Sequence, residues 1–149
     1  MKGLKIKFLS IVVVLLFSVK TSAQSSYINQ YKTLASELSQ EFGIPTAVIL
    51  SIAYVETGGG NSKTSQVLNN HFGMVGKNTV NSSRFKSFSD AKESFRSFCQ
   101  MITRKKYYMK LKGNFNHTEW VSAIASAGYS TKPEEWKKKI NQVINRFGL

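Results

Sequence analysis

Apolar residues recur at steps of three and four along most of the chain, which is the spacing of one face of an α-helix. The pattern is clearest over residues 27–42 and 133–147. The apolar positions of these two stretches are Ile28, Tyr31, Ala35, Leu38 and Phe42, then Trp136, Ile140, Val143, Ile144 and Phe147. A glycine follows each stretch directly, as is typical where a helix ends. The spacing therefore predicts a first helix over 27–42 and a last helix from Pro133 to Gly148.

The same reasoning predicts further helices between these two. Pro45 is placed to open a helix that runs to Glu56 and ends at the glycine run 58–60, since proline is tolerated in the first helical turn. Ser89 and Asp90 provide capping side chains for a helix whose apolar stripe ends at Ile102. Residues 107–111 continue the helical region, and a helix that begins at Thr118 is broken at residue 128.

The segment from Met74 to Phe88 has a different character. Turn-forming residues at 76–78 and 81–83 separate short stretches that could pair, so we expect a small β-hairpin there. The chain has no internal repeat, low-complexity segment or linker. We therefore expect one mainly helical domain over residues 24–149 with a small β-hairpin lobe.

The first residues resemble an export signal in the order of their charged, apolar and small residues. Three lysines precede an apolar core over residues 8–19, and Thr21-Ser22-Ala23 forms a small-residue exit. The core is about 12 residues long, short of the roughly 20 that span a bilayer. We expect residues 1–23 to be a signal peptide whose removal leaves no stable membrane anchor, and the protein to be secreted or periplasmic.

The chain is strongly basic, with a net charge of +13. Without the four lysines of residues 1–23, the remaining 17 basic and 8 acidic residues give about +9. Such a charge favours an anionic partner, and nucleic acid, an anionic lipid surface or an acidic wall polymer would each fit. We interpret the basic clusters 104–106 and 137–139 as solvated helix faces.

Glu56 is the residue that the helical pattern does not explain. It continues the stripe formed by Ile49 and Ile52, so a carboxyl follows buried aliphatic residues at the end of a helix. Burial and the partial negative charge of a helix C-terminus both disfavour the ionised form and raise the pKa. A carboxyl that stays protonated beside a glycine-lined backbone is suited to act as a general acid. An exposed glutamate at a frayed helix end is the alternative interpretation.

Several motifs in order make the chain resemble the glucosaminidase domains of bacterial cell-wall hydrolases, the flagellar-rod and autolysin type of endo-β-N-acetylglucosaminidase, which are distantly lysozyme-like. The resemblance extends from about residue 31 to residue 149. The motifs that carry it are Gly43-Ile44-Pro45, Glu56-Thr57-Gly58, Asn61-Ser62, Asn69-Asn70-His71-Phe72-Gly73, Arg84-Phe85-Lys86-Ser87-Phe88 and Gly128-Tyr129-Ser130-Thr131. The resemblance implies a lysozyme-like helical domain that hydrolyses the β-1,4 bond between N-acetylglucosamine and N-acetylmuramic acid of peptidoglycan glycan strands.

The resemblance also implies roles for individual residues. Glu56 matches the catalytic acid, and Tyr129 matches a tyrosine that faces the cleft, where its phenol could position water or stabilise an oxocarbenium ion. Tyr129 could equally pack after a helix with its hydroxyl in solvent. Asn69 and Asn70 could bind sugar groups, with Phe72 beside them, or they could be turn residues around a phenylalanine of the core.

A second carboxylate is missing from the place where better-known relatives have one. Residues 73–88 contain no Asp or Glu, and Asp90 and Glu93 are placed to cap a helix. Three routes remain open: a water held by Tyr129, the N-acetyl carbonyl of the substrate as nucleophile, or a lytic transglycosylase reaction with a single acid. A peptidoglycan-binding module without activity is a further alternative.

The remaining residues give no sign of cofactor chemistry. Cys99 is the only cysteine, so we interpret it as a small core residue and expect no internal disulfide. His71 and His117 are expected at the surface without neighbours at metal-ligand spacing, so no metal and no cofactor is predicted. No motif for nucleic-acid binding is present. We expect a monomer that acts on peptidoglycan.

Overall fold

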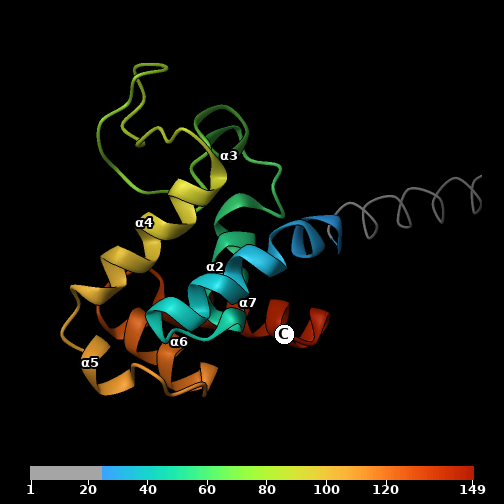
Figure 1. Ribbon diagram of the computed structural model, residues 1–149, viewed down its shortest axis with the longest axis vertical. Helices are drawn as coiled ribbons and strands as arrows, with labels where there is room; N and C mark the ends of the chain where they lie inside the picture. Colours follow the sequence, from blue (N-terminus) through green and yellow to red (C-terminus); the bar gives the residue numbers. More distant parts are fainter. Residues whose placement is uncertain (1–24) are drawn as a thin grey trace, which may run out of the picture.

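Helices make up almost all of the regular structure in the computed structural model, which describes residues 25–149 (Figure 1). The predicted signal peptide, residues 1–23, lies outside the described residues. A first helix covers residues 25–42. The elements after it are α2 (Thr46–Thr57), α3 (Lys63–Leu68), α4 (Ala91–Thr103), α5 (Tyr108–Leu111), α6 (His117–Ser126) and α7 (Pro133–Phe147). The mainly helical fold predicted from the periodicity is confirmed.

Helix α2 lies in the middle of the other helices (Figure 1). It packs against α7, α6 and α4. Its residues from Val48 to Ala53 are completely buried, and apolar side chains lie on every side of the helix. A helix of this kind has no solvent face, so the rest of the fold must surround it. The last turn of α2, which carries Glu56, is therefore held in place from several sides.

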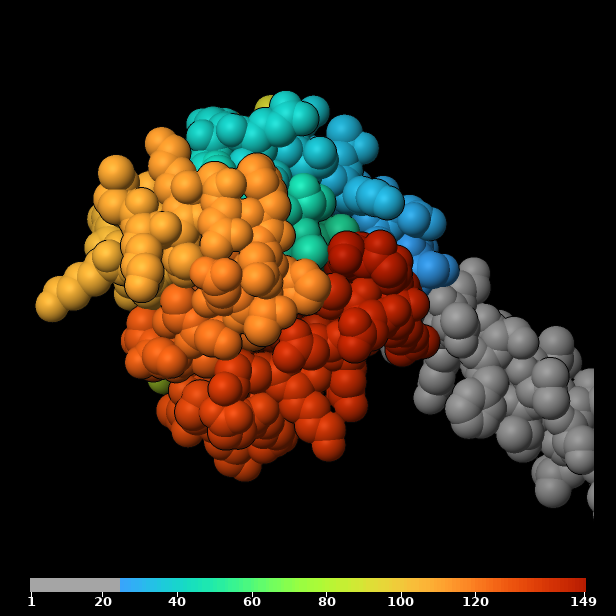
Figure 2. Space-filling view, turned by 90° about the horizontal axis from the view of Figure 1, so that it is seen from below, coloured from blue at the N-terminus to red at the C-terminus, as the bar shows by residue number. Residues whose placement is uncertain are grey.

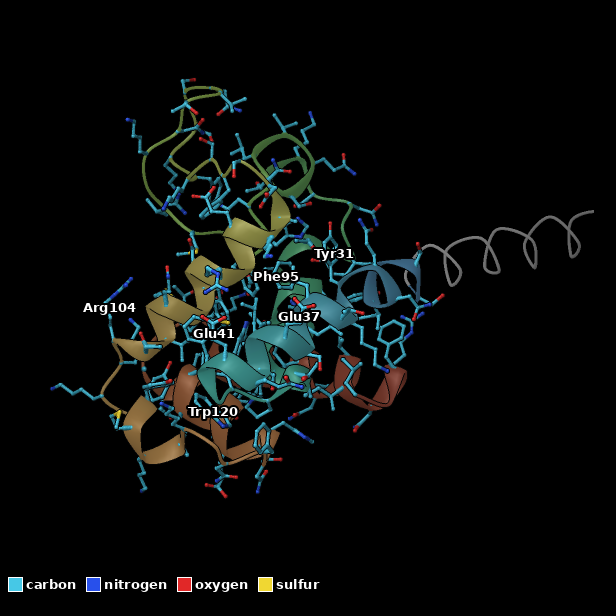
Figure 3. All side chains as sticks on the ribbon, in the orientation of Figure 1. Tyr31, Glu37, Glu41, Phe95, Arg104 and Trp120 are labelled. Atoms are coloured by element: carbon cyan, nitrogen blue, oxygen red, sulfur yellow. The ribbon has the colours of Figure 1, made fainter. Side chains whose placement is uncertain are left out.

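The helix over residues 25–42 lies across α4. Tyr31 stacks on Phe95 with ring centroids 5.1 Å apart, and Figure 3 shows the two side chains between these helices. Both guanidinium nitrogens Nη1 and Nη2 of Arg96 donate hydrogen bonds to Glu41, at 2.6 and 2.8 Å. These contacts fix α4, and with it the loop that precedes α4, against the N-terminal helix.

Helices α5, α6 and α7, coloured orange to red, form most of the face seen from below in Figure 2. Trp120 of α6 is fully buried, and its indole N–H donates to the carbonyl of Asn114 at 2.6 Å. Cys99 on α4 is also fully buried, which confirms its predicted place in the core. Within the part of the chain that the structure describes, no helix has the length and apolarity to cross a bilayer.

The predicted β-hairpin is not formed as a pair of strands. Across residues 73–88 the structure has a single antiparallel bridge, between Val75 and Phe85. Much of the remaining bonding comes from Asn78, whose Nδ2 donates to the carbonyl of Phe85 at 2.8 Å and whose Oδ1 accepts from the amides of Val80 and Asn81. Three backbone hydrogen bonds also join the two arms, from the amides of residues 76, 86 and 87 to the carbonyls of residues 84, 74 and 77, so the segment is a loop closed by these bonds and by the Asn78 amide, without a strand ladder.

Candidate active site

Glu56 occupies the last turn of α2. Helix α2 ends at Gly58, whose backbone is left-handed with φ 58°. Glycine adopts this conformation without strain because it has no Cβ. Gly60 continues the turn at φ 88°, where a Cβ would lie 2.6 Å from the ring of Tyr27. The glycine run thus reverses the chain immediately after Glu56 and packs against a buried tyrosine.

The carboxyl of Glu56 is half-buried and has one direct donor. The indole N–H of Trp136, on α7, donates to Oε1 at 3.0 Å. The other oxygen, Oε2, faces Gly73, where a Cβ would lie 3.9 Å from it. The carboxyl is therefore held between the first turn of α7 and the start of the loop 73–88. The space next to Oε2 stays open because Gly73 has no side chain.

Burial raises the pKa of Glu56 above its ordinary value, and the Trp136 hydrogen bond and the charge of Lys139 oppose this only in part. The direction is the one expected from the apolar stripe of α2. A carboxyl in this state keeps its proton to higher pH than an exposed glutamate does. After it loses the proton, the indole N–H of Trp136 can still donate a hydrogen bond to the carboxylate. These are the properties of a general acid.

Tyr129 lies close enough to Glu56 to sense its charge, and its catalytic role stays a prediction. Its ring packs on Trp136 with centroids 5.3 Å apart, and its hydroxyl donates to the carbonyl of Phe72 at 3.3 Å. Burial and the neighbouring charge of Glu56 raise the pKa of Tyr129 well above its ordinary value. The phenol is therefore neutral, and it ties the loop after α6 to the loop that holds Gly73.

The three residues predicted to bind substrate are engaged within the protein. Asn69 caps α3 at φ 51°, and its amide donates to the carbonyls of Phe88 and Ser89. The side-chain amide of Asn70 makes four bonds to the backbone, donating to Met74 and Lys86 and accepting from residues 72 and 74. Phe72 is buried and stacks on Phe98 at 4.1 Å. These contacts organise the loop, and direct binding of sugar stays a prediction.

A pocket of about 260 Å³ opens at Glu56. Its lining comes from the last turn of α2, the loop after Tyr129 and the first turns of α7. The lining residues are Val55, Glu56, Ser130, Thr131, Lys132, Glu135, Trp136 and Lys139. Reasoning from the sequence did not include the α7 residues in the site. The sequence offered one indication of their place in the site. Positions 132, 135, 136 and 139 have the spacing of one helix face, and this face begins close to Tyr129 in the sequence.

The expectation that His71 is a surface residue is wrong. His71 is 4% exposed, and its Nδ1 lies 2.7 Å from the hydroxyl of Tyr27. Its imidazole packs among Tyr27, Tyr31 and Phe95. The unprotonated nitrogen of a neutral imidazole can accept a hydrogen bond from the phenol hydroxyl, so this polar ring has a partner inside the core. Across residues 25–149, His, Cys, Asp and Glu side chains form no group of three or more that could hold a metal ion.

Comparisons with known proteins identify the family of the chain. The family model described as mannosyl-glycoprotein endo-beta-N-acetylglucosaminidase, the glucosaminidase family, matches residues 32–149. Exo-glucosaminidase LytG of Bacillus subtilis (strain 168) is 23% identical over an alignment of 148 residues that covers 85% of this chain and 52% of LytG. The chain thus spans about half the length of that relative.

Solved structures with the same fold include domains from three bacteria. The catalytic domain of the autolysin Auto from Listeria monocytogenes matches with a TM-score of 0.73 and 18% identity over 85% of each chain. The glycoside hydrolase domain of Salmonella typhimurium FlgJ matches at 0.68 and 19%, over 84% of this chain and 88% of that one. A peptidoglycan hydrolase from Sphingomonas sp. A1 matches at 0.66 and 20%, over 80% and 86%. Because the family model covers most of the chain, the protein belongs to the glucosaminidase family of glycoside hydrolases.

Proposed function

We propose that this protein hydrolyses the β-1,4 bond between N-acetylglucosamine and N-acetylmuramic acid in peptidoglycan, with Glu56 as the general acid. The observation that carries the proposal is a half-buried carboxyl with a raised pKa in the wall of an open pocket. Membership of the glucosaminidase family supports the sugar that is recognised. The names of the autolysin Auto and of the Sphingomonas peptidoglycan hydrolase support peptidoglycan as the polymer.

The contacts of Glu56 suit both states of the acid. In the protonated state its carboxyl gives the proton to the glycosidic oxygen as the C1–O bond breaks. The carboxylate that remains accepts the indole N–H of Trp136 at 3.0 Å and lies near the positive charge of Lys139. These two groups stabilise the negative charge that develops on Glu56 during proton transfer. Burial alone would leave that charge without a partner.

We assign Tyr129 to the same step. Its neutral phenol and ring lie next to Glu56 and Trp136, so the ring excludes water from one side of the carboxyl. Direct stabilisation of positive charge on the sugar ring by this phenol stays a prediction, because its hydroxyl bonds to the carbonyl of Phe72 and Tyr129 is not among the residues that line the pocket. Tyr129→Phe should lower turnover while leaving the Glu56–Trp136 contact intact.

We also propose that the protein acts outside the cytoplasm, secreted or periplasmic, as a monomer. Peptidoglycan lies outside the cytoplasmic membrane, and residues 1–23 have the pattern of an export signal. A net charge of about +9 over the remaining chain favours binding to an anionic wall rather than repulsion from it. Nucleic acid is not expected as a partner, since no binding motif for it is present.

The test is the variant Glu56→Gln, with Glu37→Gln as its matched control. Glu37 lies exposed on the helix over residues 25–42, so its substitution should not change turnover. E56Q should lose at least about 100-fold in the rate at which purified peptidoglycan sacculi are solubilised, because removing a general acid costs 10²–10⁴-fold. Equal turnover of E56Q and the parent would refute Glu56 as the acid.

Mass spectrometry of the soluble products separates the alternatives. Reducing N-acetylglucosamine ends support the hydrolase. The absence of Asp and Glu from residues 73–88 favours a lytic transglycosylase as second candidate, and 1,6-anhydromuramic acid ends would establish it. A parent protein that binds sacculi without releasing any product would instead be a peptidoglycan-binding module.

A further inference from the structure

Hydrolysis of a glycoside usually needs a second carboxylate besides the acid. Most acidic side chains of residues 25–149 have a structural partner away from Glu56. Glu41 pairs with Arg96, Asp90 and Glu93 cap α4, Glu119 accepts from Asn114 and Asn116, and Glu134 pairs with Lys137. Those acids are therefore committed elsewhere.

Glu135 differs from these residues because it lines the same pocket as Glu56. It lies in the first turn of α7, next to Trp136, and Trp136 is the residue whose indole N–H bonds to Glu56. The backbone of α7 thus holds both the donor to one carboxyl and the second carboxyl itself. Helix α7 fixes the backbone positions of both residues, and the exposed side chain of Glu135 lies where the pocket opens to solvent.

Two lysines keep Glu135 ionised. Its Oε1 lies 3.1 Å from Nζ of Lys139, and its Oε2 lies 3.8 Å from Nζ of Lys132. These charges lower the pKa of Glu135, whereas burial raises the pKa of Glu56. Between the two pKa values one carboxyl carries a proton and the other a negative charge. Two carboxyl groups separated in this way are suited to act as acid and base in one reaction.

We infer that Glu135 is the second catalytic carboxylate, and that it accepts a proton from the attacking water in the pocket it shares with Glu56. The inference rests on the proposed function. In the balanced step, Glu56 gives its proton to the leaving oxygen, the C1–O bond breaks, and water oxygen bonds to C1 while its proton passes to Glu135. At about 30 Å³ for each water, a pocket of about 260 Å³ has room for the attacking molecule.

Lys139 connects the two groups. It pairs with Glu135 and also lowers the pKa of Glu56. During the reaction Glu56 becomes negative and Glu135 becomes neutral, so the net negative charge near Lys139 does not change. The lysine can therefore stabilise both the start and the end of the proton transfers without moving far.

The matched pair Glu135→Gln and Glu134→Gln tests the inference on the full chain with sacculi as substrate. Glu134 is the sequence neighbour of Glu135, is not part of the pocket lining, and pairs only with Lys137. E135Q should lose about 10²–10⁴-fold in turnover at unchanged affinity for sacculi, and the acidic limb of its pH–rate profile should disappear. E134Q should match the parent in both. E135Q turnover within about threefold of the parent would overturn the inference.

Chemical rescue guards against a merely structural effect. In Glu135→Ala, added formate should restore part of the lost turnover, because a small carboxylate can take the vacated place. Formate should not restore Glu56→Ala, which lacks the acid. If the parent is active, E56Q is inactive and formate has no effect on E135A, the role of Glu135 fails while the proposed function stands. If E56Q equals the parent, the proposed function itself fails.

Discussion

Replacing Trp136 with phenylalanine should shift the pH dependence of activity upward. The indole N–H of Trp136 donates to Oε1 of Glu56 at 3.0 Å, and this bond is stronger when the carboxyl is ionised. Its loss therefore destabilises the carboxylate relative to the acid. Since the general acid must be protonated to act, the alkaline limb of the pH–rate profile follows the pKa of Glu56. The limb should move to higher pH in W136F.

The size of the shift follows from the bond that is lost. A hydrogen bond to a charged group contributes about 1.5–3 kcal/mol, and 1.36 kcal/mol corresponds to one pH unit. Glu56 is only half-buried, so water can replace part of the interaction. A shift of about one pH unit is therefore expected. Lys139 lowers the pKa of Glu56 in the parent and in the variant alike, so its effect cancels from the difference.

The assay is the initial rate of sacculus solubilisation from pH 4 to 9 for the parent, W136F and Trp120→Phe. Trp120 is the other tryptophan, and its N–H donates to the carbonyl of Asn114, away from the site. W120F should unfold at lower temperature yet keep the parental pH profile. An alkaline limb that stays in place in W136F, or that moves equally in W120F, would refute the assignment of Glu56 as the titrating acid.

Two further predictions concern the loop beside the site. Burial lowers the pKa of His71 to about 4 from 6.5, so the unfolded chain binds the proton more readily and stability falls as pH drops through this window. The free energy of unfolding in urea should fall by about 3 kcal/mol more in the parent than in His71→Gln between pH 7 and pH 4, and equal losses would contradict this. Asn70→Ala removes four hydrogen bonds to the backbone and should lower that free energy by about 3 kcal/mol. Parental stability with weaker binding to sacculi would instead assign Asn70 to the substrate.

The helices could be predicted because their signals are local. Apolar spacing and end residues are read within a few turns of chain, and Gly43, Gly58 and Gly148 each have the positive φ expected after a helix. Helix α3 was missed since it has only six residues and too short an apolar pattern, although Ser62 caps it through a bond from the amide of Ser65.

The loop 73–88 shows why turn signals alone are insufficient. The asparagines and serines that indicated a hairpin do form a turn, with Asn78 bonding the amides of residues 80 and 81, but backbone bonds between the two arms extend only around the single bridge and form no strands. The buried place of His71 had no local signal either. It depends on the rings of Tyr27 and Phe95, which lie far from it in the sequence.

Sequence reasoning could predict the parts of the site that lie near Glu56 in the chain, but not the parts that come from distant segments. A carboxyl on the buried stripe of α2 opposes folding, because an ionised group loses its hydration there. Natural sequences break local rules of this kind mainly where function requires it, so the violation itself points to Glu56 as the proposed acid. Its partner Trp136 is 80 residues away and had looked like an ordinary core position of α7. Glu56 is thus visible in the sequence as a candidate because its carboxyl conflicts with the apolar stripe of its own helix. Trp136, which bonds to it, fits the apolar pattern of α7 and is brought to Glu56 only when α2 and α7 pack together.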